Sequence, residues 1–113
     1  MTIFEALADP NRRRILDLLR ERPRLVGELV NEMKISQPLM SKHLRVLREV
    51  GLVSVRQDAQ RRWYELRPDP LAEVHAWLTT YRHLWEARMD RLDDYLQELQ
   101  EVEKKHEQGQ DNR

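Results

Sequence analysis

No cysteine occurs in the 113-residue chain, and glycine occurs only three times. Without cysteine there can be no disulfide framework, thiolate nucleophile or thiolate metal site. The serines are restricted to Ser36, Ser41 and Ser54, and the sequence has neither a glycine-rich phosphate loop nor a nucleophile elbow. These absences favour a function other than catalysis.

Long apolar runs are also missing. No segment approaches the length of a membrane span, and the first residues do not combine a basic stretch with an apolar one. We therefore expect a soluble protein of the cytoplasm. The length is that of one domain, and a hydrophobic content of 40% fills only a modest core. Such a small domain often gains stability by dimerising.

The formal net charge is zero, but the charges are unevenly distributed. Residues 1–68 hold 14 Lys and Arg against 9 Asp and Glu, whereas residues 69–113 hold 6 against 11. Residues 36–62 alone hold 6 basic and 2 acidic side chains. A local excess of this kind is attracted to a phosphate backbone. The neutral total therefore conceals a basic face that predicts nucleic-acid binding.

The residues that follow Ser36 have the pattern of a capped amphipathic helix. Ser36 is a good N-cap, Pro38 is tolerated in the first turn, and Gly51 can end the helix in a left-handed conformation. On a helical wheel, one arc is apolar and consists of Leu39, Met40, Leu44, Val46, Leu47 and Val50. The opposite arc consists of Gln37, Pro38, Ser41, Lys42, Arg45 and Arg48. A short helix with such a polar face fits the major groove of DNA.

Residues 36–53, Ser-Gln-Pro-x-x-Ser-Lys-His-Leu-Arg-Val-Leu-Arg-Glu-x-Gly-Leu-Val, resemble the recognition helix of the ArsR (arsenical-resistance repressor) family of winged helix-turn-helix regulators. Upstream, residues 4–16 resemble the N-terminal signature of that family, and Val26-Gly27-Glu28-Leu29 resembles the start of its first helix-turn-helix helix. Together these motifs cover roughly residues 4–67. The resemblance implies a regulator that binds double-stranded DNA as a homodimer.

The fold class that we predict is mainly α with a small β-hairpin wing, in the order α-α-α-α-β-β-α. Thr2 and Glu5 form a capping-box pattern for a short first helix. Asp9-Pro10 supplies the N-cap and first-turn proline of a second helix, which Pro23 ends. A third helix at about residues 25–33 is joined to the next by Lys34-Ile35, a link short enough for a helix-turn-helix.

Two β-prone stretches, residues 52–57 and 61–66, predict the hairpin. Its tip, Asp58-Ala59-Gln60, lacks the glycine that is common there in ArsR-like chains. Because Ala59 and Gln60 adopt positive φ only at a higher energy, we expect a loop of about three to five residues rather than a tight two-residue turn.

DNA contacts are predicted on the polar arc and beside the hairpin tip. Glutamine pairs bidentately with adenine and arginine with guanine, so Gln37, Ser41 and Arg45 are candidates for reading bases. The other basic side chains are candidates for phosphate or minor-groove contacts. The full predicted set is Gln37, Pro38, Ser41, Lys42, Arg45, Arg48, Arg56, Arg61 and Arg62. The alternative for each is a solvated polar or charged surface.

His43 falls inside the apolar arc of the same helix. We expect it to be packed and hydrogen-bonded where the helix meets the hairpin, in preference to contacting DNA.

A long last helix is predicted from Asp69-Pro70 to about residue 105, within a single domain of residues 1–105. Apolar residues recur on it at spacings of 3 and 4: Leu71, Val74, Leu78, Tyr81, Trp85, Met89, Leu92, Leu96, Leu99 and Val102. It would be about 50 Å long, more than a body of this size can cover. Residues 106–113 have no such stripe, and we expect disorder there.

The simplest partner for this stripe is a second copy, in a two-fold dimer that also uses the first helix. The predicted interface consists of Phe4, Leu78, Tyr81, Trp85, Met89, Leu92 and Leu96. A tail that binds a different protein is the alternative.

Many ArsR-like proteins bind metals, in two kinds of site. The region of the thiolate site is here Glu28-Leu29-Val30-Asn31-Glu32, without a thiol. The other kind has Asp-x-His and His-x-x-Glu on the last helix, which Glu73-Val74-His75 and His83-Leu84-Trp85-Glu86 match in ligand type. Their histidines are eight residues apart instead of eleven, so they point about 80° apart on a helix. We predict no metal and no cofactor.

The sequence thus predicts a dimeric repressor that recognises an imperfect inverted repeat overlapping a promoter, often its own, and that lacks the usual metal sites. Aromatic residues Trp77, Tyr81, Trp85 and Tyr95 could line a pocket for a small organic effector, or simply pack in the dimer. Two alternatives remain: a metal-responsive sensor that uses His75, His83 and Glu86, and a winged-helix module for protein–protein interaction.

Overall fold

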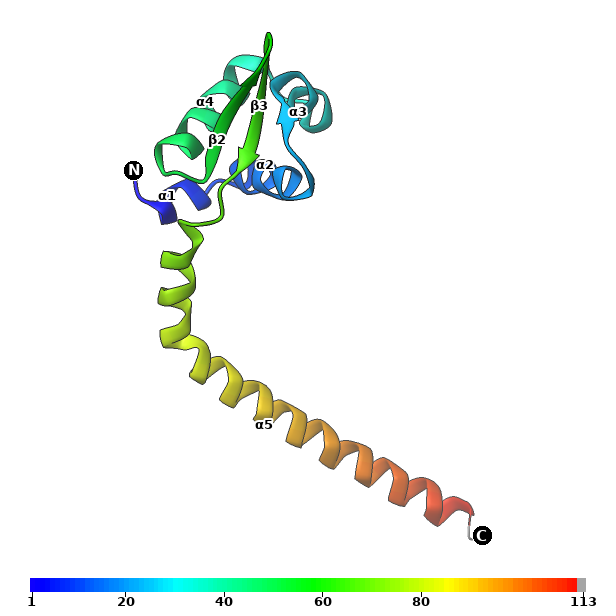
Figure 1. Ribbon diagram of the computed structural model, residues 1–113. Helices are drawn as coiled ribbons and strands as arrows, with labels where there is room; N and C mark the ends of the chain where they lie inside the picture. Colours follow the sequence, from blue (N-terminus) through cyan, green and yellow to red (C-terminus); the bar gives the residue numbers. More distant parts are fainter. Residues whose placement is uncertain (112–113) are drawn as a thin grey trace. The chain divides into compact units, whose positions relative to one another are not determined.

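The computed structural model describes residues 1–111. The elements follow one another as α1 (Ile3–Leu7), α2 (Pro10–Glu21), β1 (Arg24–Leu25), α3 (Val26–Met33), α4 (Gln37–Glu49), β2 (Val53–Asp58), β3 (Arg61–Leu66) and α5 (Leu71–Asp111) (Figure 1). The mainly helical fold with a small antiparallel sheet confirms the predicted class. The chain divides into two compact units, Met1–His75 and the part that begins at Ala76.

The sequence patterns predicted the starts of three helices correctly. The backbone N–H of Glu5 donates to Thr2 Oγ1 (3.1 Å), and the N–H of Leu39 donates to Ser36 Oγ (3.3 Å). Asp9 Oδ1 accepts from the N–H groups of Asn11 and Arg12 at 2.8 and 3.2 Å. Each oxygen thus satisfies N–H groups that have no partner inside the helix.

The sheet contains a strand that the sequence analysis did not predict. Its order is β1-β3-β2, and β1 pairs antiparallel with β3 so that Arg24 lies opposite Tyr64. Two residues are too few to show an alternation of apolar and polar side chains. Because Leu25 belongs to this strand, α3 begins one residue later, and the Leu25 N–H donates to Glu28 Oε1 at 3.3 Å.

The turn at the tip of the wing is shorter than the loop that the sequence predicts. Asp58 pairs with Arg61, so only Ala59 and Gln60 lie between the strands, and Ala59 has a φ of +56°. The prediction of a longer loop was therefore wrong. A left-handed alanine costs about 1–2 kcal/mol, and the hydrogen-bonded register that joins β2 to β3 offsets it.

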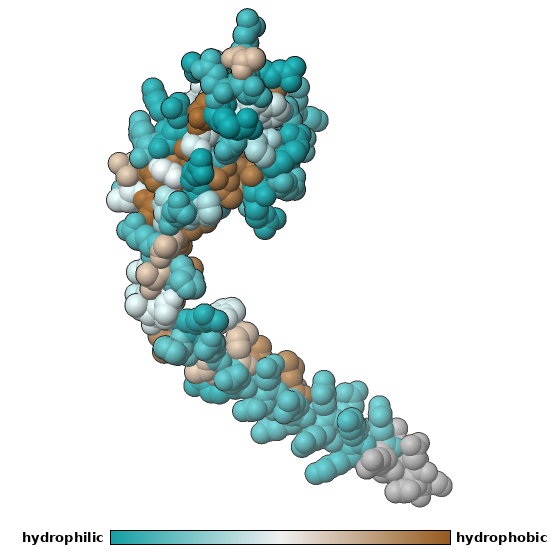
Figure 2. Space-filling model, in the orientation of Figure 1, coloured by the Kyte–Doolittle hydropathy of each residue, from teal (hydrophilic) through white to brown (hydrophobic). Residues whose placement is uncertain are grey.

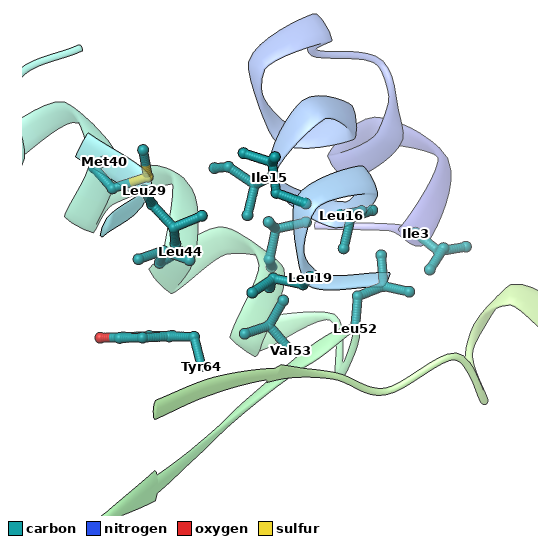
Figure 3. Close-up of a cluster of buried hydrophobic side chains, with 12 residues drawn as sticks. Ile3, Ile15, Leu16, Leu19, Leu29, Met40, Leu44, Leu52, Val53 and Tyr64 are labelled. Atoms are coloured by element: carbon teal, nitrogen blue, oxygen red, sulfur yellow. The ribbon is translucent and has the colours of Figure 1, made fainter. Parts of the chain in front are cut away.

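The core of the first unit lies between the helices and the sheet. Figure 3 shows side chains from α2 (Ile15, Leu16, Leu19), from α4 (Met40, Leu44) and from the sheet (Val53, Tyr64) converging. Leu39 and Val46 lie at the edge of the apolar arc of α4, and Leu39 remains 39% exposed. The buried arc of α4 is thus narrower than the apolar arc of its sequence, and its anchors are the fully buried Met40, Leu44 and Leu47.

Helix α5 continues to Asp111, beyond the predicted end at residue 105. Glutamate, lysine and glutamine have good helix propensity, which sustains the helix after the apolar stripe ends. The expected disorder of residues 106–113 stays a prediction, and its last two residues lie outside the described part. Within residues 1–111, no helix is long and apolar enough to cross a membrane.

Candidate nucleic-acid interface

The outward face of α4 is polar and cationic. All six residues of the predicted polar arc are exposed: Gln37, Pro38, Ser41, Lys42, Arg45 and Arg48. Pro38, Ser41, Lys42 and Arg45 line an open depression on this face. The described residues place no carboxylate within ion-pair distance of Lys42, Arg45 or Arg48. These cations are therefore available to an external anion.

The three wing arginines differ in their surroundings. Arg56 Nε donates to Glu65 Oε1 on the neighbouring strand at 2.6 Å, and this hydrogen bond raises the pKa of the guanidinium. Arg61 and Arg62 are exposed beside the turn, and within residues 1–111 neither forms an ion pair. Arg61 and Arg62 are thus better placed to bind a phosphate than Arg56, which must first break its ion pair with Glu65.

Helix α4 is held against the first two helices by a contact that sequence reasoning missed. Arg12 of α2 donates through Nε to the Ala6 carbonyl (2.7 Å) and through Nη2 to the Glu5 carbonyl (3.0 Å). Its Nη1 lies 3.5 Å from Nδ1 of His43 on α4. Arg12 therefore joins the end of α1 to α2 and α4.

His43 is packed as expected, with 6% of its surface exposed. Its polar neighbour is Arg12, however, and not a residue of the wing. Because an arginine can only donate, Nδ1 of His43 is the acceptor in this contact.

The carboxylate of Asp9 lies beside the same guanidinium, with Oδ2 3.9 Å from Nη1 of Arg12. Burial alone would raise its pKa, but the N–H groups of Arg12 and Asn11 and the nearby charge of the Arg12 guanidinium hold the pKa below its ordinary value. The only sequence signal for this arrangement was the run Asp9-Pro10-Asn11-Arg12, which identifies the N-cap but not the contact with α4.

Comparison with known proteins decides the family. A family model described as "Bacterial regulatory protein, arsR family" matches residues 9–55. The transcriptional repressor SdpR of Bacillus subtilis is 32% identical over 79 residues, which cover 70% of this chain and 88% of SdpR. This chain belongs to the ArsR family.

Other proteins and solved structures are similar to this chain to a comparable degree. The HTH-type transcriptional regulator Rv2034 of Mycobacterium tuberculosis is 42% identical over 71 residues, which cover 63% of this chain and 66% of that protein. A crystal structure titled as an ArsR family transcriptional regulator superposes with a TM-score of 0.65 at 34% identity, over 74% of this chain and 87% of the other. NolR from Sinorhizobium fredii superposes with a TM-score of 0.58 at 38% identity, over 68% and 77% of the two chains.

The ArsR membership confirms the predicted function at the level of the family. The protein is a DNA-binding transcriptional regulator, and this class of proteins is not enzymatic. Helices α3 and α4 form its helix-turn-helix, and strands β2 and β3 form its wing.

The candidate metal ligands of this ArsR-family chain lie on α5. Glu86 accepts from Arg82 Nε at 2.8 Å, so its carboxylate already has a cationic partner. In the described part of the chain, no group of three or more His, Asp or Glu side chains is placed to hold a metal ion.

The predicted dimer residues are exposed in the single chain. Their exposed fractions range from 37% for Met89 to 64% for Trp85, and the others are Phe4, Leu78, Tyr81, Leu92 and Leu96. Figure 2 shows apolar side chains at the surface of α5 on the face drawn. The rings of Trp77 and Tyr81 make an edge-to-face contact, with centroids 5.2 Å apart, which leaves both about half exposed. Apolar surface of this extent usually marks an interface.

Proposed function

We propose that this ArsR-family regulator is a cytoplasmic, dimeric repressor that binds an inverted-repeat operator overlapping a promoter, including its own. The observation that carries the proposal is the exposed face of α4, where Lys42 and Arg45 line an open depression and Arg48 is exposed on the same helix. The described residues place no carboxylate within ion-pair distance of these three cations. The relative SdpR is itself named a transcriptional repressor.

Two sets of side chains contact the DNA in different ways, one at the phosphates and one at the base edges. Lys42 and Arg48 on α4 and Arg61 and Arg62 on the wing bind phosphates, which supplies most of the affinity and makes it sensitive to salt. The residues that read base edges are Gln37, Ser41 and Arg45. Pro38 lies in the first turn of α4 and lines the depression without donating a hydrogen bond. Arg56 adds a phosphate contact only when it leaves Glu65.

Two copies place two α4 helices in successive major grooves about 34 Å, or one turn of DNA, apart. The exposed apolar stripe of α5, together with Phe4 of α1, supplies the surface that joins the copies. Two-fold symmetry of the protein then requires an operator with two inverted half-sites.

Release from DNA follows from a small organic ligand, from a partner protein or from a change in concentration, and not from a metal. The described residues of one copy assemble no metal site, and the carboxylate of Glu86 is engaged by Arg82.

The test is binding of the purified protein to a labelled fragment from upstream of its own gene, measured by fluorescence anisotropy between about 50 and 200 mM salt. We expect binding that survives a scrambled competitor and weakens steeply with salt. Weak, equal binding to both fragments at every salt concentration would contradict the proposal and favour an interaction module.

A further inference from the structure

One large apolar side chain is left uncovered on the helix that carries the basic face. Leu39 of α4 is 39% exposed, and from residue 5 to residue 75, all of which the structure describes, no other large hydrophobic side chain is as exposed. Met40 and Leu44 of the same helix are buried. The helical wheel places Leu39 on the apolar arc, so its exposure is a property of the tertiary structure that the sequence pattern did not predict.

Leu39 lies in the first turn of α4, the part of a recognition helix whose side chains contact base edges. The hydrogen bond from its own backbone N–H to Ser36 Oγ, 3.3 Å, fixes this turn. Lys42 follows Leu39 by three residues and Pro38 by four, and side chains at these spacings are neighbours on a helix. An apolar patch of Pro38 and Leu39 therefore lies beside a cation that has no described carboxylate within ion-pair distance.

An apolar side chain in this place fits one feature of the major groove. The base pairs present hydrogen-bonding groups there, and thymine alone adds an apolar group, its C5-methyl. The side chain of Leu39 neither donates nor accepts a hydrogen bond, so covering the polar groups of the other bases would cost desolvation without compensation. Covering a methyl group removes apolar surface from water on both partners. The base that Leu39 favours is therefore thymine.

We infer that Leu39 reads a thymine by packing against its C5-methyl, so that each half-site of the operator has a thymine where Leu39 meets the groove. The inference rests on the proposed DNA binding. It adds to the polar side chains Gln37, Ser41 and Arg45 a fourth reader, which recognises a base by an apolar contact instead of a hydrogen bond.

The test removes the methyl group and the leucine in turn. The probe is a duplex that the wild-type protein selects from a randomised pool, so the experiment does not depend on where the natural operator lies. Each thymine is replaced singly by deoxyuridine, which lacks only the C5-methyl, and binding is measured by fluorescence anisotropy. We expect one thymine in each half-site at which the replacement weakens binding of the wild type roughly fourfold, the effect of one buried methyl group.

Leu39→Ala should weaken binding to the thymine duplex and abolish the difference between thymine and deoxyuridine at that position. A merely structural role of Leu39 would weaken binding to both duplexes alike and leave the difference intact. The matched control is Val46→Ala, because Val46 lies on the same flank of α4 two turns later and is half-buried. This variant also loses apolar surface, but it should keep the fourfold difference.

Two results would overturn the inference and leave the proposed function intact. One is a Leu39→Ala variant that still distinguishes thymine from deoxyuridine at the sensitive position. The other is a selected duplex in which no deoxyuridine replacement changes the affinity of the wild type. Failure of the wild type to select any duplex would instead refute sequence-specific binding itself, and the reading of thymine with it.

Discussion

The guanidinium of Arg12 and the imidazole of His43 face each other across α2 and α4, with Nη1 3.5 Å from Nδ1. The same guanidinium donates to two carbonyls at the end of α1. Because α4 carries the proposed base-reading side chains, this contact links the position of the DNA-binding helix to that of α1.

Arg12→Ala should therefore destabilise the fold by about 2 kcal/mol, the typical effect of removing a hydrogen-bonded charged partner. The free energy of urea unfolding measures this. Arg13→Ala is the matched control, since the side chain of Arg13 is exposed and, among the described residues, donates to the Leu7 carbonyl alone, at 2.7 Å. Equal losses for the two variants would show that Arg12 has no special role.

Ala59→Gly should stabilise the chain by about 0.5–1 kcal/mol, because glycine relieves the left-handed strain at the wing turn but gains entropy in the unfolded state. Ala59 has a φ of +56°, and its neighbour Gln60 is not in the positive-φ region. Gln60→Gly should consequently destabilise. Thermal unfolding of the two variants distinguishes them, and stabilisation by both would argue against the two-residue turn.

Arg45→Ala should relax base preference at one position of each half-site, at a cost of about 1–3 kcal/mol on the preferred sequence. Lys42→Ala should weaken binding to all DNA sequences alike and reduce the slope of log K against log salt by about 1. Binding to a set of single-base operator variants separates these effects. A uniform weakening by Arg45→Ala would identify Arg45 as a phosphate contact.

Glu28 should make the stability of the first unit depend on acid pH. The hydrogen bond from Arg22 Nη2, 2.6 Å, and that from the Leu25 N–H lower the pKa of Glu28 from its ordinary value of 4.5. A carboxylate whose folded pKa is lowered contributes stability that is complete above pH 4.5 and lost as the pH falls through the folded pKa.

The stability advantage of the wild type over Glu28→Gln should accordingly shrink as the pH falls below 4.5. Urea unfolding at a series of pH values measures it. An advantage that did not change with pH would mean that the Arg22 interaction does not persist in solution.

Zinc should leave operator affinity unchanged, because the described residues of one copy bring no ligand set together. Anisotropy with added zinc tests this in the dimer, where ligands from two copies could meet. Stoichiometric release from DNA that His83→Ala abolishes would instead establish a metal sensor.

Local chemistry explains why much of the fold could be predicted. The caps at Thr2, Asp9 and Ser36 act on N–H groups two or three residues away, and the two faces of α4 follow from helical periodicity alone. The cationic DNA-binding candidates on α4 could be found for the same reason. They lie on the helix face opposite the buried Met40, Leu44 and Leu47 and are therefore exposed.

The sequence by itself determined the helices, their polar and apolar faces and the concentration of basic residues on α4 and the wing, because these depend on neighbours within a few positions. Only the tertiary structure decided the pairing of Arg24 with Tyr64, the left-handed Ala59 and the contact of Arg12 with His43. Each of the two contacts joins residues that are distant in the chain, and Ala59 takes a conformation that its own propensity disfavours. Strand register and packing therefore outweighed local preference at these three places.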